Sequence, residues 1–408
     1  MKRLHGFSLV VAATAIAGVA GYLITWWVAR QTGLAEYRVF AVFWAFLYLL
    51  IGALSGIQQE LARATRPLDG PAPIEHNHHA RNFAVAAFVA VAALVIGTAP
   101  LWERAAFPGH GWALVWPLAI GAASWVLVSI ILGSLYGTSQ WSAISWIIVV
   151  DPVLRLLLLV IALSFTRDLL VLAWLVALPV PVTLLVLSPL LRRRLAVVPE
   201  TDVGFGRLVW NVSRTVLAAA ALSLMVSGFP LALGVTTKGQ AAQVGLLILL
   251  ITLTRAPLIV TVMSLQSFLV VRFRDHAATM WRTFFALLAL LLGGAGVLAA
   301  LAWLLGPPVF AFLFPHDPKP AGSLLAVLVG SSALVAAMCI SAAAALSRAE
   351  HLVYSVGWVV AAVVTVICLM VPLPLDQRAL LALVAGPAAG LLVHGIGIAA
   401  TRSKVLPS

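Results

Sequence analysis

Charged residues are scarce in this sequence. Of its 408 residues only 9% are Asp, Glu, Lys or Arg, whereas 63% are hydrophobic. Soluble globular domains are usually about half apolar and about a quarter charged, so this composition cannot cover a water-facing surface. Because the apolar excess recurs from one end to the other, the sequence predicts a polytopic membrane protein without a soluble domain.

Cysteine and acidic residues are also rare. The only two cysteines, Cys339 and Cys368, lie in separate apolar runs, which excludes a disulfide framework and offers no metal spacing. We therefore expect neither a metal nor a cofactor. Lys and Arg outnumber Asp and Glu by 25 to 13, which in a membrane protein indicates basic loops facing an anionic leaflet. No basic stretch carries interleaved aromatic residues that would stack on bases, so we expect no nucleic-acid partner.

Long apolar runs, by contrast, are abundant. A helix needs about 20 apolar residues to cross a bilayer, and the first run is longer than the core of a cleaved signal peptide, so we expect it to be retained. We predict twelve spans, at 7–29, 39–57, 82–100, 112–136, 143–165, 169–190, 211–234, 243–268, 283–305, 323–346, 352–371 and 379–401.

Basic residues predict the orientation of these spans. If the N-terminus is inside, the inner segments hold more than twice as many Lys and Arg residues as the outer segments. This asymmetry, together with the even number of spans, predicts a multi-pass protein of the inner (plasma) membrane with both termini in the cytoplasm.

The most basic connection lies at the midpoint of the chain. It predicts an N-terminal six-helix lobe at 1–190, a cytoplasmic basic linker at 191–210 and a C-terminal six-helix lobe at 211–408. Similar segments, "TGLAEYRVFAVF" (32–43) and "KGQAAQVGLLIL" (238–249), recur at equivalent places in the two halves. Such internal duplication is typical of transporters.

Three charged residues lie well inside predicted spans, namely Asp151, Arg155 and Arg255. Each costs about 2.5–3.5 kcal/mol at the centre of a membrane helix, so such residues normally face a bundle interior or an aqueous cavity. Asp151 and Arg155 are four residues apart and share one helix face. Asp151 has two potential partners, Arg155 and Arg255, and the sequence does not choose between them.

The residue after this acid adds a second prediction. Asp followed by Pro is a helix-start signature, so Asp151 and Pro152 predict a break of the span near residue 151. Because 152–165 is too short to cross a bilayer alone, the preceding apolar residues must also lie in the membrane.

Arg255 has no acidic residue within one turn on its own helix. At 100° per residue, Thr252 and Gln266 lie within about 60° of it, which predicts a polar stripe. An arginine in this position requires a partner from another helix, cavity water or an anionic ligand. Further candidates for substrate contact are Gln58 and Gln59, with a plain helix-end role as the alternative, and Asn211 and Arg214, with snorkelling at the interface as the alternative.

The segment "ITWWVARQTGLAEYRVFAVFWAFLYLLIGALSGIQQELARAT" (24–65) resembles the opening of polysaccharide-biosynthesis flippases. These belong to the multidrug/oligosaccharidyl-lipid/polysaccharide exporter superfamily, whose fold is called MATE-like. Gly33, Tyr37 and Phe40 match the turn that joins spans 1 and 2 in that family, whereas Arg38 stands where the family usually has Gly. "TRAPLIVTVMSLQSFLVVRF" (254–273) resembles span 8 of the same family.

The resemblance implies an all-α MATE-like fold and an alternating-access flippase, not an enzyme. The implied substrate is a polyprenyl-(pyro)phosphate-linked saccharide or a related lipid-linked cell-envelope precursor. Because guanidinium groups bind phosphate bidentately, Arg255 and Arg155 would bind the head group, and Asp151 would hold Arg155 or release it when protonated. The implied partners are this lipid-linked saccharide, the lipid bilayer, and cell-envelope glycosyltransferases or polymerases.

Two alternatives remain. A cation-coupled exporter of small drugs on the same fold should offer unpaired acids, but only Asp151 lies deep in a span, with Arg155 one turn away. A membrane glycosyltransferase needs acidic catalytic residues in a sizeable outer loop. The first outer loop, with Glu36, is short, and the largest one, at 306–322, carries a single acid, Asp317.

Overall fold

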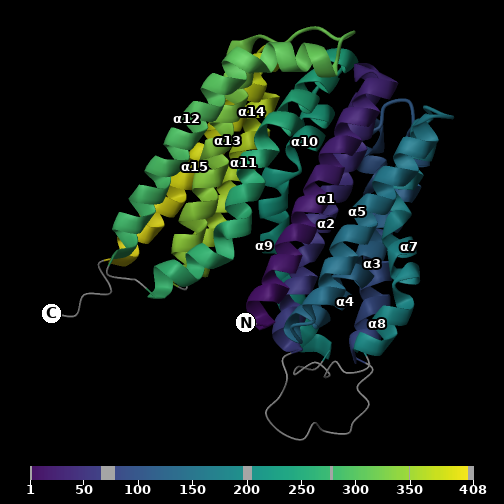
Figure 1. Cartoon of the computed structure of the whole chain (residues 1–408), viewed down its shortest axis with the longest axis vertical. Coiled ribbons are helices and arrows are strands. Elements are labelled where there is room, and N and C mark those ends of the chain that lie inside the picture. Colours follow the sequence, from purple (N-terminus) through teal and green to yellow (C-terminus); the bar gives the residue numbers. More distant parts are fainter. Residues whose placement is uncertain (1, 66–78, 196–204, 276–278, 349, 403–408) are drawn as a thin grey trace, which may run out of the picture. The chain divides into compact units, whose positions relative to one another are not determined.

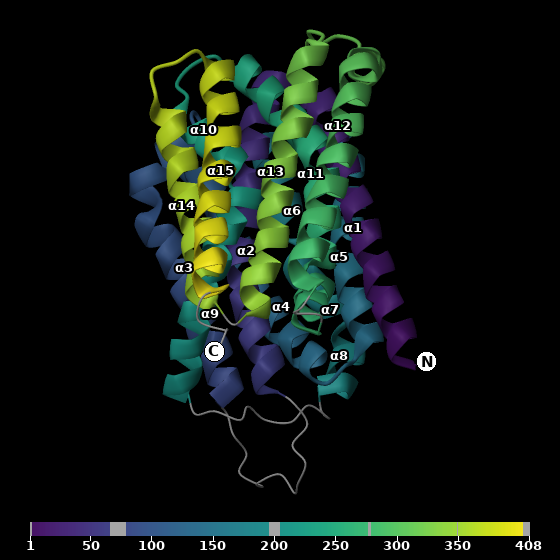
Figure 2. The ribbon, with the colours of Figure 1, turned by 90° about the vertical axis from the view of Figure 1, so that its left-hand side faces the viewer.

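The computed structural model describes residues 2–65, 79–195, 205–275, 279–348 and 350–402, and their regular structure is α-helical (Figures 1 and 2). The helices are α1 (Lys2–Thr32), α2 (Leu34–Ala64), α3 (His79–Ala106), α4 (Trp112–Gly137), α5 (Trp141–Leu163), α6 (Leu169–Ala177), α7 (Pro179–Val186), α8 (Ser188–Leu195), α9 (Phe205–Val226), α10 (Phe229–Thr236), α11 (Ala241–Asp275), α12 (Met280–Leu313), α13 (Gly322–Ser347), α14 (His351–Met370) and α15 (Leu375–Arg402).

The helices account for the predicted membrane spans. In the described ranges, 11 helical segments are long and apolar enough to cross a bilayer, and Ala241–Arg255 is a further, shorter apolar stretch. That stretch is the first part of α11, which is 35 residues long and covers the predicted span 243–268. The protein is therefore an all-α polytopic membrane protein, as its composition predicted.

The chain divides into two compact units, Met1–Ser223 and Leu224–Ser408. The division falls inside α9, later in the chain than the predicted linker at 191–210. The first part of α9 belongs to the first unit because its polar residues bond to α2. Asn211 donates to Glu60 at 2.9 Å, and the Thr215 hydroxyl donates to the Gly56 carbonyl at 2.9 Å.

In the first unit, α4 is the central helix. It packs against α2 and α3, while α1 lies along α5 (Figure 2). Small residues of α4 lie where its neighbours approach. A Cβ added at Gly121 would meet Leu47 and Ala177, and one added at Gly133 would meet the Gln58 backbone. Membrane helices commonly use small residues in this way, because lipid offers no hydrophobic force to hold them together.

The helix α5 runs unbroken through Pro152, so the predicted break near residue 151 is wrong. Proline removes one hydrogen bond, the one to the carbonyl four residues earlier. Unwinding the helix there would leave several backbone groups without partners, and lipid supplies none. Continuing the helix through Pro152 therefore loses fewer backbone hydrogen bonds than unwinding it.

Other predicted spans are interrupted. The span at 169–190 contains α6, α7 and the first residues of α8, and α6 and α7 meet at Leu178, immediately before Pro179. The span at 211–234 consists of most of α9 and of α10, which a turn at 227–228 separates. In both cases the second helix has a proline at its first or second position. Because proline has no backbone N–H, it cannot donate a hydrogen bond to a carbonyl of the helix before it.

The connection between α1 and α2 is a single residue, Gly33, where we expected a short loop around Glu36. Gly33 has φ of +77°, a left-handed conformation that glycine adopts without a steric cost. Its carbonyl accepts from the Tyr37 backbone N–H at 2.9 Å. The Gly33 to Phe40 segment thus forms a tight helical hairpin, with Tyr37 and Phe40 buried.

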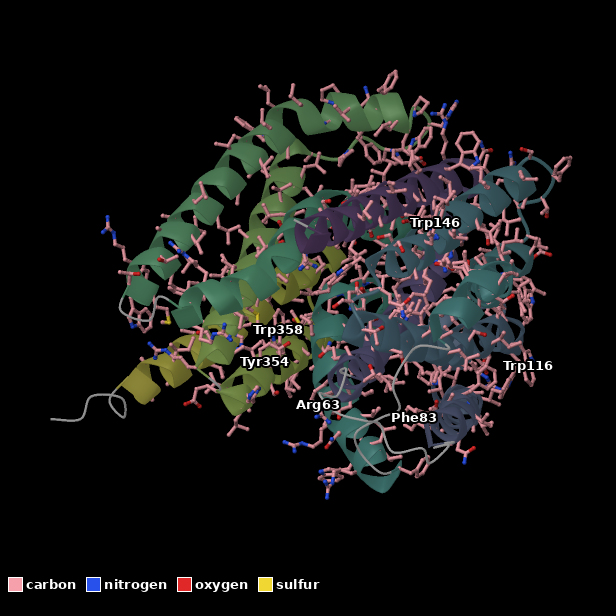
Figure 3. All side chains as sticks on the ribbon, turned by 60° about the horizontal axis from the view of Figure 1, so that its bottom comes forward. Arg63, Phe83, Trp116, Trp146, Tyr354 and Trp358 are labelled. Carbon is pink, nitrogen blue, oxygen red and sulfur yellow. The ribbon has the colours of Figure 1, made fainter. Side chains whose placement is uncertain are left out.

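In the second unit, α13 packs against α11, α12 and α15, and α14 lies alongside α15 (Figures 1 and 2). Its core includes a run of buried alanines, 342–345, on α13. The α14–α15 contact is close because His394 occupies the space beside Gly357. The His394 ring lies 2.8 Å from the Ser341 hydroxyl and 3.2 Å from the carbonyl of Tyr354, which Figure 3 labels.

Candidate functional site

The helix α5 places Asp151 and Arg155 one turn apart on the same face, and the two side chains pair. Arg155 Nη2 donates to both carboxylate oxygens of Asp151, at 3.1 and 2.9 Å. Arg155 is completely buried and Asp151 is 7% exposed. Of the two partners that the sequence left open for Asp151, the structure therefore selects Arg155.

Aromatic residues of α2 complete this cluster, and the sequence analysis missed them. Arg155 Nη1 donates to the Tyr48 hydroxyl at 2.6 Å. The guanidinium carbon lies 5.6 Å from the Trp44 ring centroid and 5.7 Å from that of Tyr48. The spacing of four residues between Trp44 and Tyr48 was the available signal, since it places both rings on one face of a helix.

The contacts of Arg155 leave little of it for a ligand. Its two terminal nitrogens are occupied by Asp151 and Tyr48, and the neighbouring carboxylate cancels its charge. Only Nε lacks a hydrogen-bond partner in the described part of the chain. For Arg155 to bind a phosphate bidentately, Asp151 or Tyr48 would have to release it.

Arg255 is in a different situation. It lies on α11 in the second unit, is 4% exposed, and has its guanidinium carbon 5.7 Å from the ring centroid of Phe229 on α10. Its Nε is buried without a hydrogen-bond partner, and the described residues provide no carboxylate that pairs with it. A ring face compensates a buried cation only in part, since a desolvated cation–π contact contributes about 2 kcal/mol.

The other predicted members of the Arg255 stripe, Thr252 and Gln266, offer fewer groups for contact with a ligand than Arg255 does. The Thr252 hydroxyl donates to the Ile248 carbonyl of its own helix at 2.8 Å, so its proton is already used. Gln266 belongs to the continuous helix α11, but its side chain lies outside the described residues.

Asn211 belongs to a separate polar cluster at the end of α2. Glu60, which is 5% exposed, accepts from Asn211 at 2.9 Å and from Arg63 Nη2 at 2.6 Å. Figure 3 labels Arg63 on the ribbon of α2. The sequence missed Glu60, although its spacing of three residues from Arg63 is typical of a helical ion pair.

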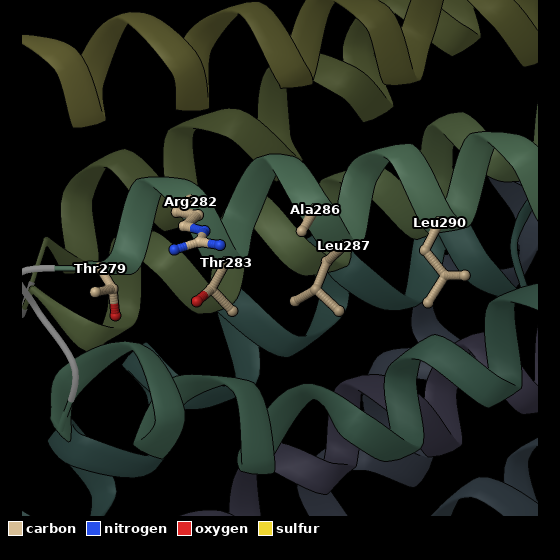
Figure 4. A pocket seen from close by; sticks show the side chains of 6 residues that line it. All are labelled: Thr279, Arg282, Thr283, Ala286, Leu287 and Leu290. Carbon is tan, nitrogen blue, oxygen red and sulfur yellow. The ribbon is translucent and has the colours of Figure 1, made fainter.

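The remaining candidates show no specific contact of this kind. Gln58 is half-buried on α2, whereas Gln59 and Arg214 are exposed. An open groove of about 410 Å³ lies along α12 (Figure 4) and contains no predicted site residue. Its lining is Thr279, Arg282, Thr283, Ala286, Leu287 and Leu290.

The two predicted arginines thus form two buried sites, each within its own unit. The first consists of Asp151, Arg155, Tyr48 and Trp44. The second consists of Arg255 and Phe229. Within the described residues the first site is neutral and fully bonded except at one nitrogen, whereas the second holds a positive charge with no carboxylate beside it.

Known proteins resemble this chain in sequence and in fold. No protein-family model matches the chain. An uncharacterized protein of Mycobacterium tuberculosis is 34% identical over 393 residues, which is 96% of this chain and 90% of that protein. An uncharacterized protein of Mycobacterium bovis is 32% identical over 398 residues, which is 96% of this chain and 91% of the relative.

Two solved structures share the fold. One is an inward-facing conformation of a multidrug resistance MATE family transporter of the MOP superfamily, with a TM-score of 0.72 and 15% identity over 98% of this chain and all of the other. The outward-facing conformation of such a transporter gives a TM-score of 0.63 over 98% of this chain and 96% of the other, again at 15% identity. The chain therefore belongs to the family of these mycobacterial proteins and has the fold of MATE transporters.

Proposed function

We propose that the protein is a transporter that moves an anionic, lipid-linked saccharide across the membrane by alternating access. The substrate class is a polyprenyl-(pyro)phosphate-linked saccharide or a related cell-envelope precursor. The lipid tail can stay in the bilayer, so the protein needs to shield only the polar head group. In this proposal the protein lies in the plasma membrane with cytoplasmic termini, and cell-envelope glycosyltransferases or polymerases are its partners.

The observation that carries this proposal is the state of Arg255. A buried arginine without a carboxylate partner is costly unless something anionic joins it. A phosphate group would supply the missing charge and accept from two guanidinium nitrogens at once. The resemblance of 24–65 to polysaccharide flippases supports the same substrate class, whereas the MATE-like fold supports a transporter in general.

An exporter of small cationic drugs on this fold is the competing function. Such a protein needs an acid that is free to pair with its substrate. Among the described residues the buried acids are Glu60, Glu103 and Asp151. Asp151 is bonded to Arg155, Glu60 to Arg63 and Asn211, and Glu103 lies 3.4 Å from Arg104. Each buried acid of the described residues thus has a basic neighbour, whereas none of these residues places a carboxylate beside Arg255, which favours an anionic substrate.

The first prediction concerns Arg255→Ala in purified protein reconstituted into proteoliposomes. We expect flipping of a fluorescent undecaprenyl pyrophosphate-linked saccharide to fall at least tenfold, because an anion contact to a charged group contributes about 1.5–3 kcal/mol. Arg255→Lys should retain part of the rate, since it keeps the charge but loses the bidentate geometry.

Arg282→Ala is the matched control, because Arg282 is an exposed arginine of the same unit. We expect it to transport at the wild-type rate. Wild-type activity of a correctly folded Arg255→Ala protein would contradict the proposed role, and transport of a cationic dye in place of the lipid would favour the drug exporter.

A further inference from the structure

Aromatic side chains form a continuous row along one face of α2. The ring centroids of Tyr37 and Phe40 are 6.4 Å apart, those of Phe40 and Trp44 are 5.9 Å apart, and those of Trp44 and Tyr48 are 4.8 Å apart. The last pair is stacked, with an angle of 18° between the ring planes. The row starts at the Gly33 turn and ends at the guanidinium of Arg155.

The depth of Trp44 and Tyr48 distinguishes them from membrane anchors. Trp and Tyr normally gather at the two membrane–water interfaces. At a rise of about 1.5 Å per residue, Trp44 lies about 15 Å and Tyr48 about 21 Å from the first residue of α2. Both therefore lie near the middle of a hydrocarbon core about 30 Å thick, where interface anchoring does not explain them.

The contacts of the two rings show which way they face. The Tyr48 hydroxyl accepts from Arg155, and the Trp44 ring lies against the same guanidinium. The pair is thus directed at the charged cluster of α5 rather than at lipid. Unlike Tyr37 and Phe40, which are buried, Trp44 and Tyr48 are only half-buried, so part of each ring is free for a further contact.

A half-buried stacked pair beside a bonded ion pair matches the chemistry of a sugar ring. The face of an aromatic ring carries negative charge density, which attracts the slightly positive C–H groups on the flat face of a pyranose. The hydroxyl groups of the same sugar are hydrogen-bond donors and acceptors, and the partly exposed Asp151 carboxylate is a suitable acceptor for one of them. A lipid tail would gain nothing from these polar groups, because each would lose its water without replacement.

We propose that Trp44 and Tyr48, flanked by Asp151 and Arg155, form a subsite for a sugar ring of the transported head group. This rests on the proposed function, in which the transported head group carries a saccharide. The α2–α5 cluster, which lies within the first unit, recognises that saccharide. Trp44 then determines whether a carrier lipid with a sugar is preferred over the carrier alone.

The test compares two lipids in proteoliposomes, undecaprenyl pyrophosphate linked to N-acetylglucosamine and undecaprenyl pyrophosphate without sugar. The measured quantity is the ratio of their flipping rates. We expect Trp44→Leu to lower this ratio about tenfold, because contact with an aromatic ring face stabilises the bound sugar by about tenfold beyond simple burial. Trp44→Phe should keep the ratio within about twofold of the wild type, because a ring face remains.

Trp146→Leu is the matched control, because Trp146 is a 56% exposed tryptophan on α5 of the same unit (Figure 3). It should leave the ratio unchanged. If wild-type protein moves both lipids and Trp44→Leu does not alter their ratio, the sugar subsite is refuted while the proposed function stands. If wild-type protein moves neither lipid, the proposed function itself fails, and the subsite fails with it.

Discussion

At the scale of single residues, the molecule places charge in the membrane in two contrasting ways. Asp151 and Arg155 lie one turn apart and cancel each other, which their spacing in the sequence made predictable. Tyr48 was not predictable, because it lies 107 residues from Arg155 and reaches it only through the packing of α2 and α5. Phe229 was missed for the same reason, since nothing in the sequence near Arg255 indicates which ring covers it.

The buried ion pair leads to a prediction about stability. Asp151→Asn leaves the Arg155 charge uncompensated, so we expect a loss of about 3–5 kcal/mol in the free energy of unfolding. Tyr48→Phe removes only the acceptor of one N–H group and should cost about 1–3 kcal/mol. Urea unfolding of the purified protein in detergent, followed by circular dichroism, measures both losses.

The control is the double variant Asp151→Leu with Arg155→Met, which removes both charges. Replacing a buried pair by apolar residues of similar volume is often neutral or stabilising, so this protein should unfold near the wild-type urea concentration. An Asp151→Asn protein as stable as the wild type would show that the pair contributes nothing to the fold.

At the scale of elements, the positions of the helices follow from the apolar runs, whereas their interruptions do not. Pro152 lies inside a continuous α5, but Pro179 marks the break between α6 and α7. The same residue type thus has opposite outcomes in neighbouring spans. At the second site a further proline, Pro181, follows within the next turn, so the helix would lose two N–H donors instead of one.

The contact between α2 and α9 gives a prediction at this scale. A Cβ added at Gly56 would meet backbone atoms of Thr215 and Val216, whereas one at Gly52 would meet the Ser223 side chain. Backbone cannot rotate away, so we expect Gly56→Ala to destabilise the protein by about 1–3 kcal/mol, the usual cost of overpacking. Gly52→Ala should cost less. Thermal unfolding in detergent measures the difference.

Gly97→Ala on α3 is the matched control, because nothing lies within 4 Å of a Cβ built there. In a helix interior this exchange should stabilise by about 0.5–1 kcal/mol. Equal effects of the exchanges at Gly56 and Gly97 would mean that α9 does not pack closely on α2.

At the scale of the whole molecule, the composition predicted a membrane protein, and the length of the apolar runs predicted that helices span the bilayer. The boundary between the two compact units was harder to predict from the sequence. It depends on hydrogen bonds that bring the first part of α9 to α2, from Asn211 to Glu60 and from Thr215 to Gly56. A count of spans cannot reveal such contacts, because it treats each helix as belonging with its neighbours in the chain.

The predicted orientation can be tested with α12. This helix is 34 residues long, so at about 1.5 Å per residue its ends lie on opposite sides of a bilayer. With the N-terminus inside, Lys319 lies outside and Arg282 inside, and both side chains are exposed. We expect a membrane-impermeant maleimide to label Lys319→Cys in intact cells, and to label Arg282→Cys only after the cells are opened.

The native cysteines give little background in this experiment, because Cys339 and Cys368 are buried. The opposite labelling pattern would reverse the orientation and place the basic segment at 191–210 outside the cell.

The single-residue turn at Gly33 has a consequence for how the protein enters the membrane. Two helices of 31 residues each are joined by one residue, so the end of α1 and the start of α2 lie at the same surface of the membrane. Each helix then packs mainly on another partner, α1 on α5 and α2 on α4. If the termini are cytoplasmic, Arg38 and Glu36 beside this turn must cross the bilayer during insertion, and the apolar surface of the two helices offsets the cost of moving these charges through lipid.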